Sequence, residues 1–411
     1  MSNTADKLST AISKYCAHHA ESEIEQLNGF PNTTPFHQVV VIPAYNENFD
    51  FIARLRQLAL PNPTTLAIVV INQPHNETDG HLSETLFASA QRSGSVVWQN
   101  AQLTLLAWQQ DSYLLLVNRY SEKVRIPRKQ GVGLARKIGC DLALALQAKH
   151  LIATNLIHTT DADAVLPADY FQQTRDLNEI SAAIYPFRHR CDDDALGRAT
   201  RLYENSLHYY VRGLGWAGSP YAFHTIGSCL AISIYHYALA RGFPKRAGGE
   251  DFYLLNKLAK LAPVANTRGA ALELQARHSC RTPFGTGPAV EKILNLESPD
   301  DFPSYDPRVF AGLRTLLQHL DDLWQYRLNH TKWLNSLPAS LENACTALGI
   351  DQLLRHLANH SDSEAQYRRH THSWFDAFRT LKFVHYLQNH SYPAIPFTQA
   401  LAEADLLFAD F

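Results

Sequence analysis

The sequence lacks any apolar run close to the roughly 20 residues that a membrane-spanning helix needs. It also lacks a Cys-x-x-Cys pair, and its six scattered cysteines argue against a disulfide framework or a zinc knuckle. Neither charge sign dominates, because 37 Lys and Arg residues stand against 39 Asp and Glu residues, so no nucleic-acid partner is expected. The N-terminus shows no basic region followed by an apolar one, so we expect no signal peptide and a soluble, cytoplasmic protein with reduced thiols.

What is present is the composition of a globular protein with more than one core. Hydrophobic residues make up 45% and charged residues 18% of the 411 residues. Helical spacing over 4–28 predicts an N-terminal helix, and with its linker this segment spans 1–36. An α/β domain is expected at 37–294. From 295 to 411 the apolar spacing is helical and nothing resembles a strand, so we expect a helical C-terminal domain there.

Strand-like and helix-like patterns alternate in the first part of the α/β domain. Short runs rich in β-branched residues lie at 37–48, 66–74, 112–120 and 151–160. Helical periodicity lies between them at 48–60 and 131–149. This alternation predicts the α/β class with a mainly parallel central sheet built from βαβ units. Ligands bind beyond the carboxyl ends of such strands, where "PAYNE", "NQPHN" and "DAD" fall.

Two aspartates, Asp161 and Asp163, follow the last of these runs with one alanine between them. A turn with aspartate in a capping role is the simple alternative, and a lone D-x-D pattern is weak. Its place at a strand exit strengthens it, because a turning chain can bring both carboxylates to one polar site. Hard cations such as Mg²⁺ and Mn²⁺ take oxygen ligands. The pair therefore indicates a divalent cation that stabilises a diphosphate leaving group.

Four stretches in order resemble the family 2 glycosyltransferases of the GT-A (Rossmann-like) fold. They are "VVVIPAYNE", "RKQGVGLARKIGCDLAL", "IHTTDADAVLPADYF" and "GSCLAISIYHYALARGFPKRAGGEDFYLLNKLAKL". The resemblance covers about residues 37–290, and it departs from the family at Lys137, where an asparagine is usual. It implies a nucleotide-sugar-binding domain in which Asp163 ligates the metal and Asp161 faces the ribose or the metal shell.

The resemblance also implies donor contacts at the ends of the first two strands. Pro43 and Tyr45 belong to the family's first strand and loop, and Glu47 would hydrogen-bond the nucleoside. Asn72 stands where the family usually has an aspartate that reads the base. Because an asparagine can also pair with a base edge, Asn72 stays a donor-binding candidate, while the base itself, uracil or guanine, is left open.

The catalytic candidates are Glu250 and Asp251, which open a helix after Gly248 and Gly249. Taken alone, acids at this place would cap the helix N-terminus. With the resemblance, Asp251 becomes the expected general base that takes the acceptor hydroxyl's proton. A base opposite the leaving group implies a single displacement with inversion.

A second group of candidates lies in "ARHSCRTPFGTG" and in the helix at 131–149. By resemblance His278 completes the metal site, although an exposed or structural histidine is the alternative. Arg281 suits a diphosphate, because guanidinium matches phosphate geometry, and Arg128 and Arg136 are alternatives for that contact. At least one of the three arginines is expected to be a surface or structural residue.

The acceptor side has the weakest signals. Gly227 lies in the small-residue loop of the resemblance, and Trp216 lies in a segment crowded with aromatics. These rings could stack on an acceptor or could be core residues. They are Tyr209, Tyr210, Trp216, Tyr221 and Phe223. The run Asp192–Asp194 is expected to be a solvated loop.

The expected function is an inverting, Mn²⁺- or Mg²⁺-dependent glycosyltransferase of the hexosyltransferase type, with a UDP- or GDP-linked sugar as donor and an unknown hydroxyl acceptor. Without transmembrane helices or a Q-x-x-R-W motif, processive synthesis is disfavoured, and peripheral membrane contact stays open. Two alternatives remain. One is an inactive GT-A scaffold or adaptor. The other is a sugar-phosphate nucleotidyltransferase, which the acidic, glycine-free "PAYNENFD" disfavours.

Overall fold

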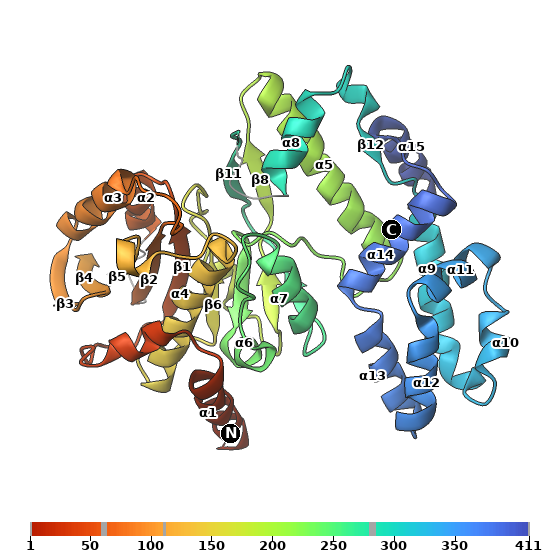
Figure 1. Cartoon of the computed structure of the whole chain (residues 1–411), viewed down its shortest axis with the longest axis horizontal. Helices are drawn as coiled ribbons and strands as arrows, with labels where there is room; N and C mark the ends of the chain where they lie inside the picture. Colours follow the sequence, from red (N-terminus) through yellow and green to blue (C-terminus); the bar gives the residue numbers. More distant parts are fainter. Residues whose placement is uncertain (1, 59–63, 110–111, 279–284, 410–411) are drawn as a thin grey trace. The chain divides into compact units, whose positions relative to one another are not determined.

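The computed structural model describes residues 2–58, 64–109, 112–278 and 285–409. The chain divides into two compact units (Figure 1). Unit 1 consists of Met1–Cys191 and Thr225–Pro288, and unit 2 consists of Asp192–His224 and Ala289–Phe411. Unit 2 therefore takes a segment from the middle of the chain in addition to the C-terminal region. The domain boundaries expected from the sequence stay predictions.

A nine-stranded sheet forms the centre of unit 1, in the order β10-β7-β9-β6-β1-β2-β5-β4-β3. Its central strands are β6 (Leu156–Thr159), β1 (Gln38–Ala44), β2 (Thr65–Asn72) and β5 (Ser112–Arg119). The outer strands are β3 (Ser95–Gln99), β4 (Leu103–Gln109), β7 (Ala182–Ile184), β9 (Leu230–Ser233) and β10 (Val264–Asn266). Among these strands, β4 and β9 run opposite to the others. The expected α/β class, with a mainly parallel central sheet and a helical C-terminal region, is confirmed.

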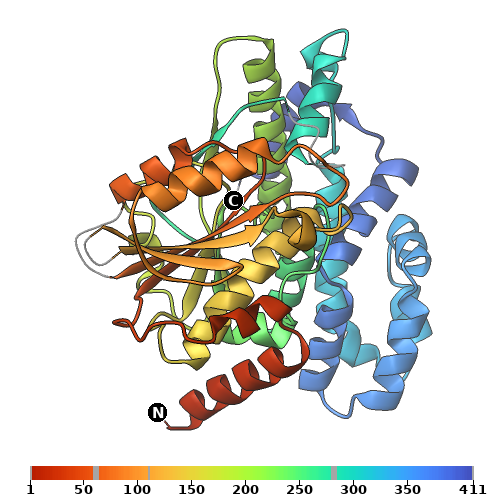
Figure 2. The same ribbon diagram turned by 60° about the vertical axis from the view of Figure 1, so that its left-hand side comes forward.

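Helices cover both faces of this sheet (Figure 2). Helices α2 (Asp50–Leu58) and α3 (His81–Arg92) lie on one side, and α4 (Gly131–Ala148) and α1 (Ser2–His18) lie on the other. Every residue of β2 is buried, as expected for a parallel strand covered on both faces. The continuous apolar runs of the sequence thus become the central strands.

The N-terminal helix is shorter than its periodicity indicates. The sequence pattern runs over 4–28, but α1 ends at His18 and a short 3₁₀ helix follows at Ser22–Leu27. Two buried, charged side chains of α4 bind the backbone of the segment between these two helices. The amide of Glu21 donates to Asp141 at 2.8 Å, and the ammonium of Lys137 donates to the carbonyl of His19 at 2.7 Å.

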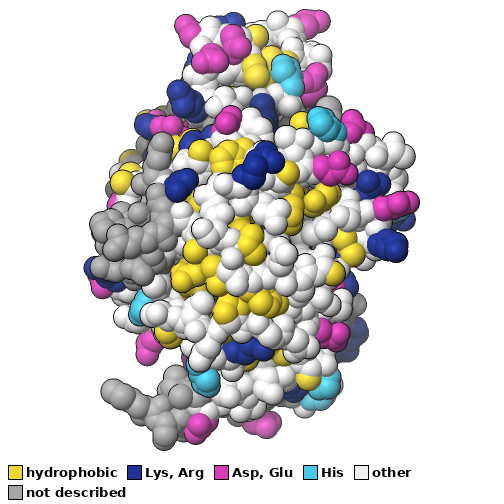
Figure 3. Space-filling model, turned by 90° about the vertical axis from the view of Figure 1, so that its left-hand side faces the viewer, with side chains coloured by type: hydrophobic (Ala, Val, Ile, Leu, Met, Phe, Trp, Pro, Cys, Tyr) yellow, Lys and Arg dark blue, Asp and Glu magenta, His cyan; other side chains and the backbone are white. Residues whose placement is uncertain are grey.

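Strand β3 is the edge of the sheet and is mostly exposed. Figure 3 faces this side of unit 1 and shows hydrophobic side chains gathered near the middle. The large apolar residues exposed on β3 and α3 are Leu82, Val96 and Val97, at 52%, 46% and 44%. The short length of β3 and the bulge between Val96 and Trp98 limit further strand pairing at this edge.

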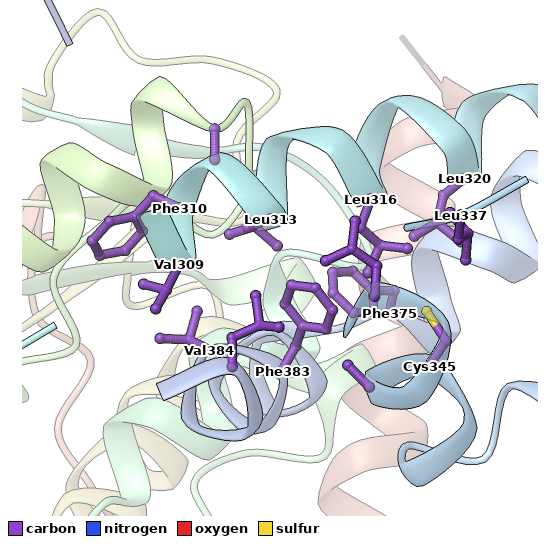
Figure 4. Close-up of a cluster of buried hydrophobic side chains, with 14 of the residues drawn as sticks. Val309, Phe310, Leu313, Leu316, Leu320, Leu337, Cys345, Phe375, Phe383 and Val384 are labelled. Carbon is purple, nitrogen blue, oxygen red and sulfur yellow. The ribbon is translucent and has the colours of Figure 1, made fainter. Parts of the chain in front are cut away.

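Unit 2 is helical and has a core of its own. Its helices are α5 (Ala195–Trp216), most of α8 (Thr286–Leu294), α9 (Arg308–Asp321), α10 (His330–Leu334), α11 (Ala339–Ala347), α12 (Ile350–His360), α13 (Glu364–Trp374), α14 (Ala377–His390) and α15 (Phe397–Leu407). Figure 4 shows side chains of α9 facing those of α14, with Val309, Leu313 and Phe383 fully buried there. One-sided apolar helices must bury that side, and here they bury it against one another.

Two details of unit 2 differ from the sequence pattern. The strands β12 (Pro303–Ser304) and β13 (Ile395–Pro396) pair, so the expectation of no strand after residue 295 is wrong for these short segments. The pattern at 341–359 is divided at Gly349, whose φ of 79° ends α11 before α12 begins. In the described part of the chain, no helix combines the length and the apolar character needed to cross a membrane.

Candidate active site

Three polar segments meet at the carboxyl edge of the sheet. Strands β6, β1 and β2 are neighbours and run parallel, so their carboxyl ends lie at one edge. Asp161 and Asp163 follow β6, Glu47 follows β1, and Asn72 ends β2. The chain turns at the aspartates, where the carbonyl of Asp161 accepts from the amide of Ala164 at 3.1 Å. Topology therefore brings these four predicted residues to one edge.

Arg136 of α4 is a buried clamp in this region, with 3% of its side chain exposed. Its Nη2 donates to Asp161 Oδ1 at 2.6 Å, and its Nε donates to Glu250 Oε1 at 2.9 Å. Its Nη1 donates to the carbonyl of Gly227 at 2.9 Å. Because its guanidinium donates to three different partners, Arg136 connects the D-x-D loop to the start of the helix that begins with Glu250. This placement suits a positioning role, whereas the sequence suggested a donor contact.

Arg277 contacts the second aspartate and links it to the first strand. Its Nη2 lies 2.6 Å from Asp163 Oδ2, and its Nη1 lies 3.3 Å from Glu47 Oε1. The local structure explains this reach. Strand β11 (Leu272–Gln275) ends just before Arg277, and Val165 exchanges backbone hydrogen bonds with Glu273 at 2.8 and 3.0 Å. Sequence reasoning missed Arg277, although it directly precedes the predicted His278.

Helix α7 (Glu250–Leu258) presents the catalytic candidates at its first turn. Gly249 is the N-cap and has a φ of 69°, a left-handed conformation that favours glycine and makes the expected tight turn. Glu250 is 3% exposed and bound to Arg136. Asp251 accepts from the amide of Phe252 at 2.7 Å. The cap position itself is thus occupied by glycine, Glu250 binds Arg136, and Asp251 accepts from a first-turn amide of α7.

The environment of Asp251 favours its neutral form. Burial, followed by the negative charge of Glu250, raises the pKa of Asp251 from its ordinary value to about 7. The amides of Phe252 and Gly227 and the charge of Arg136 act in the opposite direction without cancelling the effect. A carboxylate with a pKa near neutrality can both accept and release a proton at physiological pH.

The end of β2 holds buried amides with unused acceptor atoms. Asn72 is 4% and Gln73 is 2% exposed. Within the described part of the chain, Asn72 Oδ1 and Gln73 Oε1 have no hydrogen-bond partner, and neither has Thr160 Oγ1 at the end of β6. Buried polar atoms are normally paired, so unpaired ones at a ligand edge indicate that a ligand supplies the donors.

The other donor-side candidates are dispersed over the same edge. Pro43 lies within β1, and the hydroxyl of Tyr45 donates to the carboxylate of Glu77. Arg128 is exposed, and its amide donates to His75 Nδ1 at 3.3 Å, in the loop that follows β2. Arg281 lies outside the described residues.

Gly227 is held tightly between other groups of unit 1. Its carbonyl accepts from Arg136 and, at 2.6 Å, from Thr159 Oγ1. A Cβ placed on Gly227 would lie 2.7 Å from Arg136 Nη2, so the close approach of the guanidinium requires glycine. The residue therefore supports the clamp, and its expected acceptor contact stays a prediction.

Trp216 belongs to unit 2. Its ring lies 4.8 Å from the ring of Phe408, and Arg314 lies over it at 4.7 Å from the ring centre. Of the neighbouring aromatics, Tyr209, Tyr221 and Phe223 are buried. These packing contacts match the core alternative for the aromatic cluster.

The metal candidates are only partly brought together. Asp161 and Asp163 each bind a guanidinium, and His278 is exposed. Across residues 2–58, 64–109, 112–278 and 285–409, no three His, Cys, Asp or Glu side chains form a group that could hold a metal ion. The carboxylates offer the right oxygen donors for Mg²⁺ or Mn²⁺, but a cation at Asp163 would have to displace Arg277.

Comparisons with known proteins add a distant likeness. No family model matches the chain, and no curated protein matches it. Two solved structures of S. aureus TarS 1–349 are similar, one of them a complex with UDP-GlcNAc. Each is 12% identical and covers 81% of this chain, with 90% and 89% of the TarS chain covered and TM-scores of 0.37 and 0.36. A likeness this distant assigns neither a substrate nor site residues to this protein.

Proposed function

We propose that this protein is an inverting glycosyltransferase that moves a sugar from a nucleotide-sugar donor to a hydroxyl acceptor. The observation that carries the proposal is Asp251. Its pKa is raised to about 7, and it lies beside a clamp that joins α7 to the D-x-D loop. No comparable acid would be needed for a scaffold, because an uncompensated buried carboxylate lowers stability.

Asp251 is the general base of the proposed reaction. It takes the proton of the acceptor hydroxyl while that oxygen attacks the anomeric carbon. The bond from the anomeric carbon to the phosphate oxygen breaks, and its electron pair leaves with the nucleoside diphosphate. Glu250 does not compete for this role, since it is bound to Arg136 at 2.9 Å. It positions the start of α7 through that contact.

The nucleoside is proposed to lie at the end of β2. Asn72 Oδ1 and Gln73 Oε1 are buried acceptors without donors among the described residues. Uracil and guanine both carry ring N–H groups, so either base supplies what these oxygens lack. Filling them removes the cost of a buried unsatisfied acceptor, about 1–3 kcal/mol for each group. The pairing supports a UDP- or GDP-linked donor and does not choose between them.

The diphosphate is proposed to lie near Asp163, with a divalent cation and Arg277. Asp163 and Asp161 would hold Mn²⁺ or Mg²⁺, with His278 as a further proposed ligand. When bound, the cation supplies positive charge to the leaving diphosphate. Arg277 now neutralises Asp163 and Glu47, and a diphosphate offers its guanidinium a stronger, bidentate partner. Donor binding therefore frees the carboxylate that the cation needs.

Thermal melting with nucleotides tests the proposal. UDP, GDP and their sugar conjugates are added to the full-length protein with and without Mn²⁺. A ligand at 100 times its Kd adds about 2.7 kcal/mol, which is a measurable shift in Tm. We expect one nucleotide class to raise the Tm of the wild type. Asn72→Leu should lose that shift, and the control Asn389→Leu, at an exposed position on α14, should keep it.

Release of free sugar from the stabilising nucleotide sugar is then measured, with water as the acceptor. Asp251→Asn should abolish release while the Tm shift persists. If no nucleotide changes the Tm of the wild type, the donor site is wrong. If nucleotides bind but neither water nor any hydroxyl acceptor receives the sugar, the scaffold alternative replaces the transferase.

A further inference from the structure

Unit 2 contains a surface cavity of about 330 Å³ that the proposed transfer reaction does not use. It lies among α12, α13 and α14, which are neighbours in Figure 1. Its lining residues are Gln352, Leu353, His356, His370, Ser373, Trp374 and Arg379. The volume lies at the lower end of the range for small-molecule sites, about 300–1,000 Å³.

The lining combines one permanent cation with two ionisable ones. Arg379 belongs to α14, His356 to α12 and His370 to α13, so three separate helices contribute basic side chains. None of the described residues that line the cavity is acidic. The acid closest to Arg379 in sequence, Asp376, is already used as the N-cap of α14, where it accepts from the amide of Arg379 at 3.0 Å.

The cationic groups are fixed in place by their own contacts. Arg379 Nη1 donates to the carbonyl of Trp374 at 2.8 Å, and its guanidinium lies over the Trp374 ring at 4.5 Å. His370 Nδ1 lies 2.9 Å from Ser361 Oγ, and the rings of His370 and His356 are 4.9 Å apart. Fixed donors lose little entropy on binding, so the cavity is preorganised.

His370 is surrounded by basic side chains. Burial lowers its pKa, and the charges of His356, Arg369 and His360 lower it further. A bound anion acts in the opposite direction, because a negative charge close to an imidazole favours its protonated, donating form. Polar lining beside Trp374 also leaves room for a group larger than an inorganic ion.

We propose that this cavity binds the phosphate group of a small phosphate ester. Arg379 offers the planar guanidinium donors that match phosphate oxygens, and the two histidines add donors from the opposite helices. Ser373 and Gln352 supply neutral donors for the hydroxyls of the attached group. The phosphate comes either from a soluble sugar phosphate or from a lipid headgroup.

Binding to the full-length protein is measured with two probes that separate these sources. Isothermal titration with glucose 6-phosphate, and with glucose as the uncharged control, tests the soluble source. Co-sedimentation with phosphatidylcholine vesicles, with and without phosphatidic acid, tests the lipid source. The variants are Arg379→Gln, His356→Gln, which leaves the contacts of Arg379 in place, and Arg355→Gln, an exposed control on α12 outside the cavity.

We expect one phosphate probe to bind the wild type, with no binding of glucose or of vesicles without phosphatidic acid. Loss of a charge-assisted hydrogen bond should weaken that binding about 10- to 100-fold in Arg379→Gln and by a smaller factor in His356→Gln. Arg355→Gln should bind within about twofold of the wild type, a change well under the 1.4 kcal/mol that equals a factor of ten. Absence of binding to both phosphate probes, or binding that the cavity variants leave unchanged, overturns the proposal. Because all variants lie outside the nucleotide site, these outcomes are independent of the transferase assay.

Discussion

Two neighbouring residues of α4, Arg136 and Lys137, organise two buried ionic clusters of very different kinds. Lys137 donates to Asp141 at 2.8 Å, and Asp141 is 1% exposed. Four donors satisfy this carboxylate. They are the hydroxyls of Tyr15 and Tyr237, the amide of Glu21 and the ammonium of Lys137. An ionised carboxylate has about four acceptor sites, so this cluster is complete and leaves no place for a ligand.

The cluster of Arg136 is open on one side. Asp161 has 37% of its side chain exposed, and Arg136 is its one donor in the described part of the chain. The adjacent strand ends carry the unpaired acceptors of Asn72 and Thr160. Both clusters contain buried charge, but only the open one has groups that a ligand can still satisfy. Buried acceptor atoms without a hydrogen-bond donor therefore distinguish a candidate ligand site from a structural ionic cluster better than buried charge does.

The largest expected effect is on catalysis in the open cluster. Asp251→Asn keeps shape and removes basicity, so transfer should fall about 10²- to 10⁴-fold, the usual contribution of general-base catalysis. Donor binding should stay within a few-fold of wild type. Transfer rates with a hydroxyl acceptor and nucleotide affinities measure the two quantities.

The matched control for Asp251→Asn comes from the closed cluster. Asp141→Asn changes a carboxylate that is also buried, and its transfer rate per folded molecule should equal that of the wild type. Glu250→Gln should cost less than Asp251→Asn, because Glu250 acts through Arg136. Rates for Asp251→Asn within threefold of wild type would remove Asp251 from the mechanism.

The next effect is on stability in the closed cluster. Lys137→Met leaves Asp141 buried without its cation, and removal of one partner of a buried pair typically costs about 3–5 kcal/mol. Urea unfolding should show this loss. Adding Asp141→Asn to Lys137→Met should recover part of it, because no unpaired charge remains. A double variant less stable than Lys137→Met would show that the hydrogen bonds of Tyr15 and Tyr237, and not the charge pair, dominate the cluster.

A smaller effect is expected for the metal proposal. Asp163→Ala should remove the Mn²⁺ dependence of nucleotide binding, and His278→Ala should weaken it about 10- to 100-fold, the range seen for residues that support metal ligands. Titration of nucleotide with and without Mn²⁺ measures both. Unchanged affinity and an unchanged metal requirement in Asp163→Ala would leave Arg277 as the charge partner of the diphosphate.

The contrast between the clusters also marks what the sequence could predict. The β-branched runs predicted β1, β2, β5 and β6, and the order of the strand ends placed Glu47, Asn72 and Asp161 at one edge. These signals are local. Lys137 stands where the resemblance leads one to expect an asparagine, but its partner Tyr15 lies on α1 and no local pattern links the two. Arg277 reaches Glu47 across 230 residues of sequence, and α5 joins unit 2 by burying Tyr209 against Phe310. Such pairings depend on tertiary packing.

The smallest effect concerns pH and sharpens the assignment of Asp251. In the unfolded chain an aspartate loses its proton near pH 4, whereas burial and Glu250 raise the pKa of Asp251 in the folded protein to about 7. Between these values the folded state binds more protons than the unfolded state, so the wild type loses stability as the pH rises from 4 to 7. Asparagine has no proton to lose. The Tm of Asp251→Asn minus that of the wild type should therefore increase from pH 4 to pH 7 and level off above it.

An increase of at least about 2 °C is measurable, since about 1 kcal/mol shifts the Tm of a 150–250-residue domain by about 2–4 °C. The control for the Asp-to-Asn change itself is Asp193→Asn, at a carboxylate that is 94% exposed, measured over the same pH range. A flat difference for Asp251→Asn, or one that falls toward pH 7, would show that Asp251 is ionised at low pH in the folded protein and is held as an ion partner of Arg136.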